Sequence, residues 1–192
     1  NIELLSRYGS DEQGVQLDRL GGGAWQAKKA KLKERILKIA EGLIRTAAAR
    51  ELKPGDVLPP PEGAYEEFAA RFPYEETEDQ LTAIEAVIED FQKGRPMDRL
   101  VCGDVGFGKT EVALRSAFVA AMNGKQVAVV VPTTLLARQH FATFQARFKG
   151  LPINIAQASR MVPKKELDQV KAGITSGDID IVVGTHALLA DS

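Results

Sequence analysis

Residues 103–110 carry the clearest chemical signal in the sequence. They read Gly-Asp-Val-Gly-Phe-Gly-Lys-Thr and match the pattern G-x-x-x-x-G-K-[ST]. Glycines let such a loop curl until successive backbone N–H groups point at one phosphate, and a helix that starts there adds partial positive charge. Lys109 is expected to reach the β- and γ-phosphates, and Thr110 to offer its hydroxyl to Mg²⁺. The pattern therefore predicts a nucleotide-binding site. The residues assigned to it are Gly103, Asp104, Val105, Gly106, Phe107, Gly108, Lys109, Thr110 and Glu111.

The segments on either side of this loop have the order that a phosphate-binding loop requires. An apolar run at 99–102 predicts a strand before it, and 110–122 predicts a helix after it. The single cysteine, Cys102, is expected to be a small apolar residue at a buried strand end and not a reactive thiol. The structural alternative is a glycine-rich turn with an exposed lysine. A chance match in a chain of this length has a probability on the order of one per cent.

Strands and helices alternate through the rest of the chain. Apolar runs at 126–131, 153–156 and 179–183 predict strands, separated by helical stretches at 135–148 and 164–176. Alternation of this kind favours a parallel sheet with helices on its faces. Upstream, Thr77 is a typical N-cap for a helix that runs to about residue 93.

Polar residues follow three of the predicted strands. The carboxyl ends of parallel strands meet at one edge of a sheet, where ligands bind. Hydroxyls, backbone amides and arginines suit contacts with a nucleic-acid backbone, although each residue alone could be a helix cap or a turn. The residues are Thr133, Thr134, Arg138, Gln139, Ser159, Arg160, Thr185 and His186.

The N-terminal quarter of the chain has a different character. Apolar residues between 24 and 50 recur at helical spacing, which predicts one long, amphipathic and basic helix. From 24 to 53 there are nine basic and three acidic residues, whereas from 55 to 80 there are eight acidic residues and one basic. The proline-rich run at 53–61 separates these segments, because neither a helix nor a central strand crosses it. The basic face is more simply a solvated surface than a nucleic-acid contact.

Overall composition limits the classes of protein that fit. With 192 residues, 44% hydrophobic and 27% charged, the chain can form a substantial core and is not a disordered tail. The net charge of −1 gives no global attraction to nucleic acid, so any such contact is local. No apolar run is long enough to span a bilayer, and no secretory pattern follows Asn1. A reducing, cytoplasmic location is expected.

Six segments together resemble the motifs of superfamily 2 helicases, in the form found in the bacterial transcription-repair coupling factors. The segments are FPYEETEDQLTAI, PMDRLVC, GDVGFGKTE, PTTLLARQH, SR and GTHALL. N-terminal residues 5–8 and 17–25 also resemble the end of the RNA-polymerase-interaction domain of that family and its linking helix. The proline-rich stretch fits no pattern of the family.

The resemblance implies a fold and a division of the chain. The fold is α/β, an incomplete P-loop NTPase lobe of the RecA-like type, preceded by a long amphipathic helix. Residues 1–23 would be a remnant of the RNA-polymerase-interaction domain, 24–53 the linking helix and 54–61 a linker. Residues 62–192 would be the N-terminal part of the ATP-binding domain.

The resemblance also implies roles for individual residues. Lys109 and Thr110 would be catalytic, with ATP as the nucleotide and Thr110 as a ligand of Mg²⁺. Gln80 would read the adenine, and Phe72 would stack on it. The residues at the strand ends would line a track for double-stranded DNA. RNA polymerase and nucleotide-excision-repair proteins would be the protein partners.

The family places an Asp-Glu motif and a second motor lobe after the Gly-Thr-His segment, and neither occurs before Ser192. The resemblance implies that the whole protein is an ATP-hydrolysing translocase that displaces stalled RNA polymerase. This piece is expected to bind nucleotide but to hydrolyse it negligibly. Strand edges left unpaired predict strand exchange or an oligomer.

Three other functions are considered. A branch-migration helicase shares a looser form of the motifs. A non-catalytic module that binds RNA polymerase would use residues 1–50, with the α/β part as a scaffold. A small-molecule kinase is disfavoured because no segment supplies a lid or an acceptor site.

Overall fold

The computed structural model describes residues 21–189. The chain divides at the Leu52–Lys53 bond into two units, which are described separately below. Most of the stretch compared with an RNA-polymerase-interaction domain, including residues 5–8, lies outside the described residues. Within the described part, no helix is both long and apolar enough to cross a membrane.

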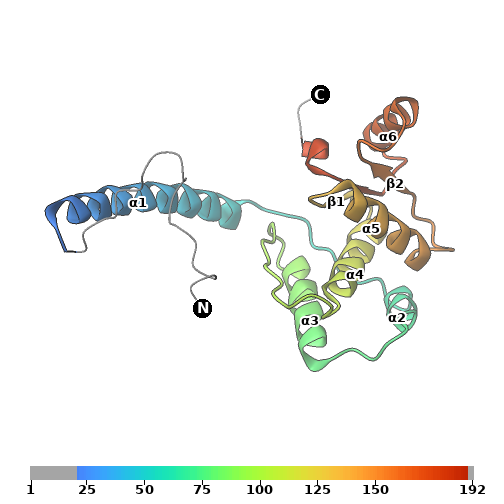
Figure 1. Ribbon diagram of the computed structural model, residues 1–192. Coiled ribbons are helices and arrows are strands. Elements are labelled where there is room, and N and C mark those ends of the chain that lie inside the picture. Colours follow the sequence, from blue (N-terminus) through green and yellow to red (C-terminus); the bar gives the residue numbers. More distant parts are fainter. Residues whose placement is uncertain (1–20, 190–192) are drawn as a thin grey trace, which may run out of the picture. The chain divides into compact units, whose positions relative to one another are not determined.

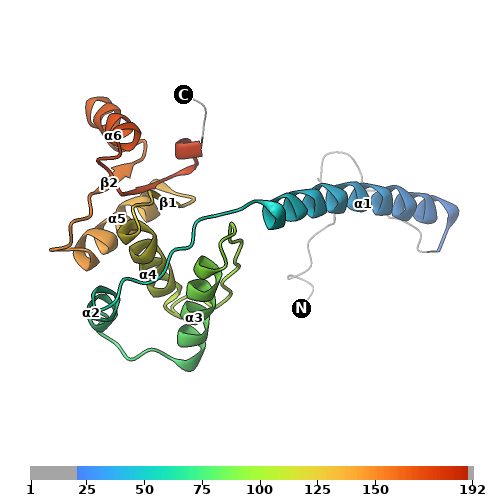
Figure 2. The same cartoon turned by 180° about the vertical axis from the view of Figure 1, so that it is seen from behind.

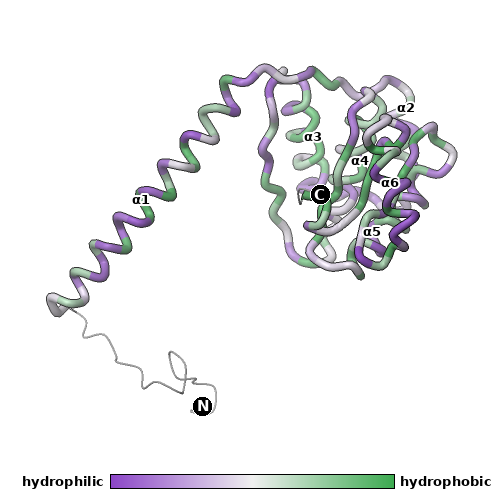
Figure 3. Tube along the Cα trace, turned by 90° about the horizontal axis from the view of Figure 1, so that it is seen from above, coloured by the Kyte–Doolittle hydropathy of each residue, from purple (hydrophilic) through white to green (hydrophobic). Residues whose placement is uncertain are grey.

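The first unit contains one long helix, α1 (Gly23–Leu52). It confirms the helix expected from the spacing of apolar residues. Figure 3 shows hydrophobic and hydrophilic residues interspersed along it. No residue of α1 is buried, and Leu32, Ile36 and Leu43 are more than half exposed. Among the described residues of this unit, none covers the apolar face of the helix.

The second unit begins with an irregular stretch that lies against the domain. Residues 53–61 form neither helix nor strand. The N–H of Gly55 donates to the carbonyl of Gly94, and that of Leu58 donates to Phe91. The side-chain amide of Asn123 donates to the carbonyl of Pro59 at 2.9 Å. The proline-rich stretch is thus attached to the second unit along its length.

The second unit alternates helices and strands, as expected. Its elements are α2 (Ala64–Ala70), α3 (Glu78–Gln92), α4 (Lys109–Met122), β1 (Val127–Val130), α5 (Thr134–Arg147), β2 (Ile155–Ala158), α6 (Lys164–Ser176), β3 (Ile181–Gly184) and the 3₁₀ helix η2 (His186–Leu189). The strand predicted at 153–156 is present two residues later, as β2.

The three strands form a parallel sheet in the order β1-β3-β2. The central strand, β3, is buried along its whole length. Its side chains alternate between two hydrophobic clusters, which explains its unbroken apolar sequence. Ile181 and Val183 belong to the cluster formed with α2, α4 and α5, and Val182 belongs to the cluster formed with α6. Figures 1 and 2 show α6 on the other side of the sheet from α4 and α5.

Aromatic rings fill the larger cluster. Phe68 stacks on Phe118 with ring centroids 4.3 Å apart, and it meets Phe148 at 4.9 Å. Phe144 stacks on Phe148 at 5.8 Å. These contacts attach α2, α4 and α5 to one another, because Phe68 lies on α2, Phe118 on α4, and Phe144 and Phe148 at the end of α5.

The strand predicted at 99–102 is wrong. This segment has no ladder partner in the described sheet and no regular secondary structure. Leu100 is 84% exposed, while Val101 packs against the small cluster between α3 and α4. Cys102 is exposed, so its expected burial at a strand end is wrong as well. An apolar run becomes a strand only where a neighbour supplies hydrogen bonds, and no described segment does so here.

Candidate nucleotide site and strand-end surface

The start of α3 is attached to the glycine-rich loop through Gln80. Thr77 caps the helix, and its hydroxyl accepts from the N–H of Gln80 at 3.2 Å. In return, Gln80 Oε1 accepts from the N–H of Thr77 at 3.0 Å. The opposite end of the same amide, Nε2, donates to the carbonyl of Phe107 at 2.9 Å. Gln80 thus connects the helix cap and the loop.

The loop turns into α4 at a glycine that no other residue could replace without strain. Gly108 is the N-cap of α4 and has φ of 71°, in the left-handed region. A Cβ atom at this position would overlap the side-chain nitrogen of Gln80. The backbone and the glutamine therefore fit together only because residue 108 lacks a side chain.

Lys109 and Thr110 are the first two residues of α4. No side chain caps this helix, so the positive end of the helix dipole at its N-terminus is open towards the loop. Lys109 Nζ folds back and donates to the carbonyls of Gly103 and Asp104, the latter at 2.7 Å. The expected phosphate-binding groups are therefore gathered at one helix start, in the order that the sequence predicts.

The side chain of Glu111 faces the interior of the domain. It is 3% exposed, and its Oε1 accepts from Arg115 at 2.8 Å and from Arg147 at 2.6 Å. Arg115 also pairs with Glu76. This hydrogen bond, together with a backbone hydrogen bond, lowers the pKa of Glu76. We call Glu76, Glu111, Arg115 and Arg147 the ion cluster.

The guanidinium group of Arg115 keeps its charge although it is buried. Burial acts to lower the pKa of Arg115, but the hydrogen bonds to Glu111 and Glu76 outweigh it, so the pKa is raised. The side chain of Glu111 is thus occupied by ion pairs. Only its backbone, in the first turn of α4, adjoins the loop.

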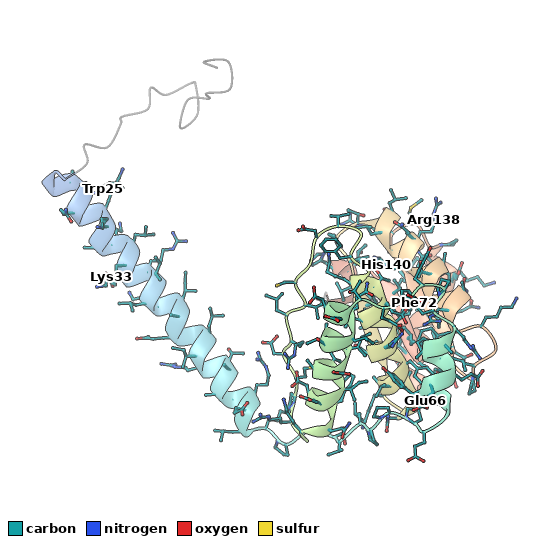
Figure 4. The ribbon with its side chains drawn as sticks, turned by 90° about the horizontal axis from the view of Figure 1, so that it is seen from below. Trp25, Lys33, Glu66, Phe72, Arg138 and His140 are labelled. Atoms are coloured by element: carbon teal, nitrogen blue, oxygen red, sulfur yellow. The ribbon has the colours of Figure 1, made fainter. Side chains whose placement is uncertain are left out.

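An open cavity of about 520 Å³ lies beside the helix start. Phe72 and Tyr74 line it on one side and Gly108 and Thr110 on another. The two aromatic rings meet edge to face with centroids 5.5 Å apart. A volume of this size with aromatic walls suits a small organic ligand. Phe72, labelled in Figure 4, is therefore part of the wall of a cavity that the start of α4 also lines.

The polar residues at the strand ends share one edge of the sheet. Val130 and Ala158 are both in register with Gly184, so the three strands end at the same level. Thr133 caps α5 and its hydroxyl accepts from the N–H of Leu136 at 3.2 Å. Gly184 is required here because a Cβ would overlap the carbonyl of Ala158. The expected convergence of the three polar segments is present.

These residues differ in exposure. Arg138, labelled on α5 in Figure 4, is exposed, as are Gln139, Arg160 and His186. Ser159 is only 3% exposed, and its hydroxyl accepts from Gln157 at 3.2 Å. Ser159 therefore has a structural contact and does not form part of the exposed surface. His186 begins η2, which is the helix-start position that its sequence context also allows.

The family model described as DEAD/DEAH box helicase matches residues 77–192. This range includes the glycine-rich loop, the capping box of Thr77 and Gln80, and the three described strands. The chain belongs to the DEAD/DEAH box helicase family. Its α/β unit is accordingly a RecA-like helicase lobe, with a parallel sheet between layers of helices.

Individual proteins resemble this helicase chain over nearly all of it. The transcription-repair-coupling factor of Rickettsia bellii (strain RML369-C) is 52% identical over 98% of the chain, and the chain spans 17% of that protein. The factor of the same name from Myxococcus xanthus is 49% identical, again over 98% of the chain and 16% of the relative. The solved structure of RecG bound to a three-way DNA junction has a TM-score of 0.70 and 34% identity. It covers 76% of this chain and 20% of the RecG chain.

The residues predicted from the sequence include four that line the cavity beside α4, Phe72, Gly108, Thr110 and Glu111, but they do not include Tyr74 or Arg147. Tyr74 shares the cavity wall with Phe72, and it could have been noticed because it lies two residues further along the same motif. Arg147 also lines the cavity, and no local signal marks it. A basic residue in the last turn of a helix is ordinarily explained by the helix dipole alone.

Proposed function

We propose that this chain is the ATP-binding part of the first motor lobe of a double-stranded DNA translocase. The whole protein would use ATP hydrolysis to displace stalled RNA polymerase and to recruit nucleotide-excision-repair proteins. The observation that carries the proposal is the glycine-rich turn into α4, where Gln80 contacts Phe107 and Gly108, and Lys109 and Thr110 begin the helix. The names of the relatives support the role in transcription and repair.

The groups at the helix start fit a nucleotide with its metal ion. The uncapped N–H groups of α4 and the ammonium of Lys109 are donors suited to phosphate oxygens. Lys109 would exchange its loop carbonyls for the phosphates. Thr110 would supply a hydroxyl to Mg²⁺, and phosphate oxygens and water would supply further ligands. Hydrolysis of the terminal phosphate would supply the energy for movement.

Isothermal titration calorimetry with ATP and Mg²⁺ tests the proposal. The chain should bind, Lys109→Ala should abolish the heat of binding, and Lys164→Ala should not. Lys164 is a matched control because it is the exposed first residue of another helix, α6. Absence of binding by the unaltered chain would refute the proposal.

Hydrolysis is tested separately, by phosphate release with and without duplex DNA. We expect negligible turnover by this chain, and DNA-stimulated release of phosphate would contradict that expectation. A role in branch migration is the second enzymatic candidate, supported by the likeness to RecG. The higher identity to transcription-repair-coupling factors favours the first candidate.

A non-catalytic role for the N-terminal helix is supported by one observation. Leu32, Ile36 and Leu43 of α1 are exposed on a basic helix, as expected of a surface that binds a partner. Capture of RNA polymerase by residues 1–53 alone would support an interaction module, and capture that requires residues 54–192 would count against it.

A further inference from the structure

The ion cluster joins three segments that are far apart in the sequence. Glu76 precedes α3, Glu111 and Arg115 lie on α4, and Arg147 is the last residue of α5. The side chains of Glu111, Arg115 and Arg147 are 3%, 5% and 9% exposed. Two carboxylates face two guanidinium groups, so the cluster is electrically balanced. Burying such groups costs about as much free energy as their attraction returns, so the cluster as a whole adds little net stability, although removing one partner is destabilising.

Arg147 differs from the other members of the cluster. Among the described residues, its Nε and Nη1 atoms are buried without a hydrogen-bond partner. Only Nη2 is paired, with Glu111. The guanidinium carbon lies 4.5 Å from the ring centroid of Phe68 and 5.9 Å from that of Phe72. One hydrogen bond and two aromatic rings therefore fix the orientation of this guanidinium group.

Arg147 also lines the cavity beside α4. Arg147 and Thr143 form the wall that α5 contributes, Phe72 and Tyr74 form the aromatic wall, and Thr110 lies at the helix start. The loop and helix start suit phosphate groups, so the aromatic wall is left for the remainder of the nucleotide. Glu111 follows Thr110 directly, and this places the support for Arg147 next to the phosphate site.

We propose that Arg147 is a positioning residue for the nucleoside end of the bound nucleotide. Glu111 holds the guanidinium group, the guanidinium group holds the ring of Phe72, and Phe72 forms the platform on which the base stacks. The inference rests on the proposed function, because it takes the ligand to be a nucleotide. It assigns to α5, which carries exposed polar residues at its other end, a contact with the nucleotide site.

Substitution of Arg147 should reduce the affinity for ATP more than the affinity for a ligand made of phosphate groups alone. Arg147→Met removes the planar cation but keeps the length of the side chain. We expect it to weaken the binding of ATP with Mg²⁺ about fivefold to tenfold, as expected for the loss of one cation–π contact. The affinity for inorganic tripolyphosphate should stay within about twofold, because the loop is unchanged. Arg147→Lys should not restore ATP binding, since an ammonium group has no flat face to place against Phe72.

Calorimetric titrations of the full chain with ATP and with tripolyphosphate test this, with melting temperatures measured in parallel. Lys149→Met, at an exposed position two residues further on, is the control and should change neither affinity. In a Phe72→Leu background, Arg147→Met should have little further effect on ATP affinity, which a purely structural role would not produce.

Two results would overturn the inference. One is an equal loss of affinity for ATP and tripolyphosphate in Arg147→Met. The other is a lower melting temperature with ATP affinity unchanged. If the unaltered chain binds neither ligand, the proposed function fails, and this inference fails with it. Binding of tripolyphosphate with the same affinity as ATP by the unaltered chain would instead overturn the inference alone.

Discussion

The side-chain amide of Gln80 donates a hydrogen bond of 2.9 Å to the carbonyl oxygen of Phe107, across 27 positions of sequence. This contact joins the N-terminus of α3 to the glycine-rich loop. Both ends of the amide are used, because its oxygen accepts from the N–H of Thr77. The segment expected to read the base and the loop expected to hold the phosphates are therefore mechanically connected.

Gln80→Glu should weaken binding of ATP. The carboxylate can still accept from Thr77, but it cannot donate to Phe107, and it adds negative charge beside the phosphate site. We expect a loss of affinity of about threefold to tenfold, measured by titration with a fluorescent ATP analogue. Gln26→Glu, at an exposed position on α1, is the control and should bind normally. Unchanged affinity in Gln80→Glu would show that the contact with Phe107 has no part in binding.

Gly108→Ala should disturb the site more than an equivalent substitution elsewhere. Gly124→Ala is a matched control, since Gly124 has φ of 72° and nothing within 4 Å of an added Cβ. Both variants carry the backbone strain of a left-handed alanine, about 1 kcal/mol. Only Gly108→Ala also displaces Gln80. We expect at least about a tenfold loss of ATP affinity in that variant alone. Equal affinity in the two variants would contradict the prediction.

Lowering the pH should reduce the free energy of unfolding, in part because Glu76 becomes protonated. Arg115 lowers the pKa of the Glu76 carboxyl below its ordinary value of 4.5. The folded-state pKa lies below the unfolded-state pKa, so the stabilisation is complete above pH 4.5 and is lost as the pH falls through the folded-state pKa. Glu76→Gln should be less stable than the unaltered chain at pH 7, and the difference should narrow below about pH 4.5. Urea unfolding over this range tests it, and a constant difference would contradict it.

Arg138 should contribute to binding of duplex DNA. It is exposed at the start of α5, beside the edge where the three strands end. Arg138→Ala should weaken binding and reduce the slope of log affinity against log salt concentration by about 0.9, the value for one phosphate contact. Fluorescence anisotropy with a labelled duplex measures both quantities. Lys149→Ala, at the other end of α5, serves as the control. An identical slope in Arg138→Ala would exclude a phosphate contact.

The described sheet leaves two edges, since β1 and β2 each pair only with β3. Unpaired strand edges favour association with another chain. We expect light scattering after size-exclusion chromatography to give masses above the 20.8 kDa of one chain, increasing with protein concentration. A single monomeric mass at all concentrations would contradict this expectation.

Local sequence patterns were enough to predict most of the helices and the glycine-rich turn that precedes α4. Helix α6 begins and ends where its pattern predicts, and Thr77 caps α3 as expected, because periodic apolar residues and capping groups act within a few positions of chain. Gly108, Lys109 and Thr110 are consecutive residues, so their placement at the start of α4 also depends on local sequence alone. The strand at 99–102 failed because strand formation depends on a neighbouring strand, which a local pattern cannot supply.

Contacts between side chains that are far apart in the sequence depend on how the helices pack. Arg147 and Glu111 are 36 positions apart, and the local sequence describes each as an ordinary charged residue of a helix. The packing of α4 and α5 on one face of the sheet brings them to 2.6 Å and surrounds them with aromatic rings. Ser159 was misjudged for the same reason, since its burial depends on the elements packed over the end of β2. Burial and long-range pairing are properties of the packed chain, so a local sequence pattern does not reveal them.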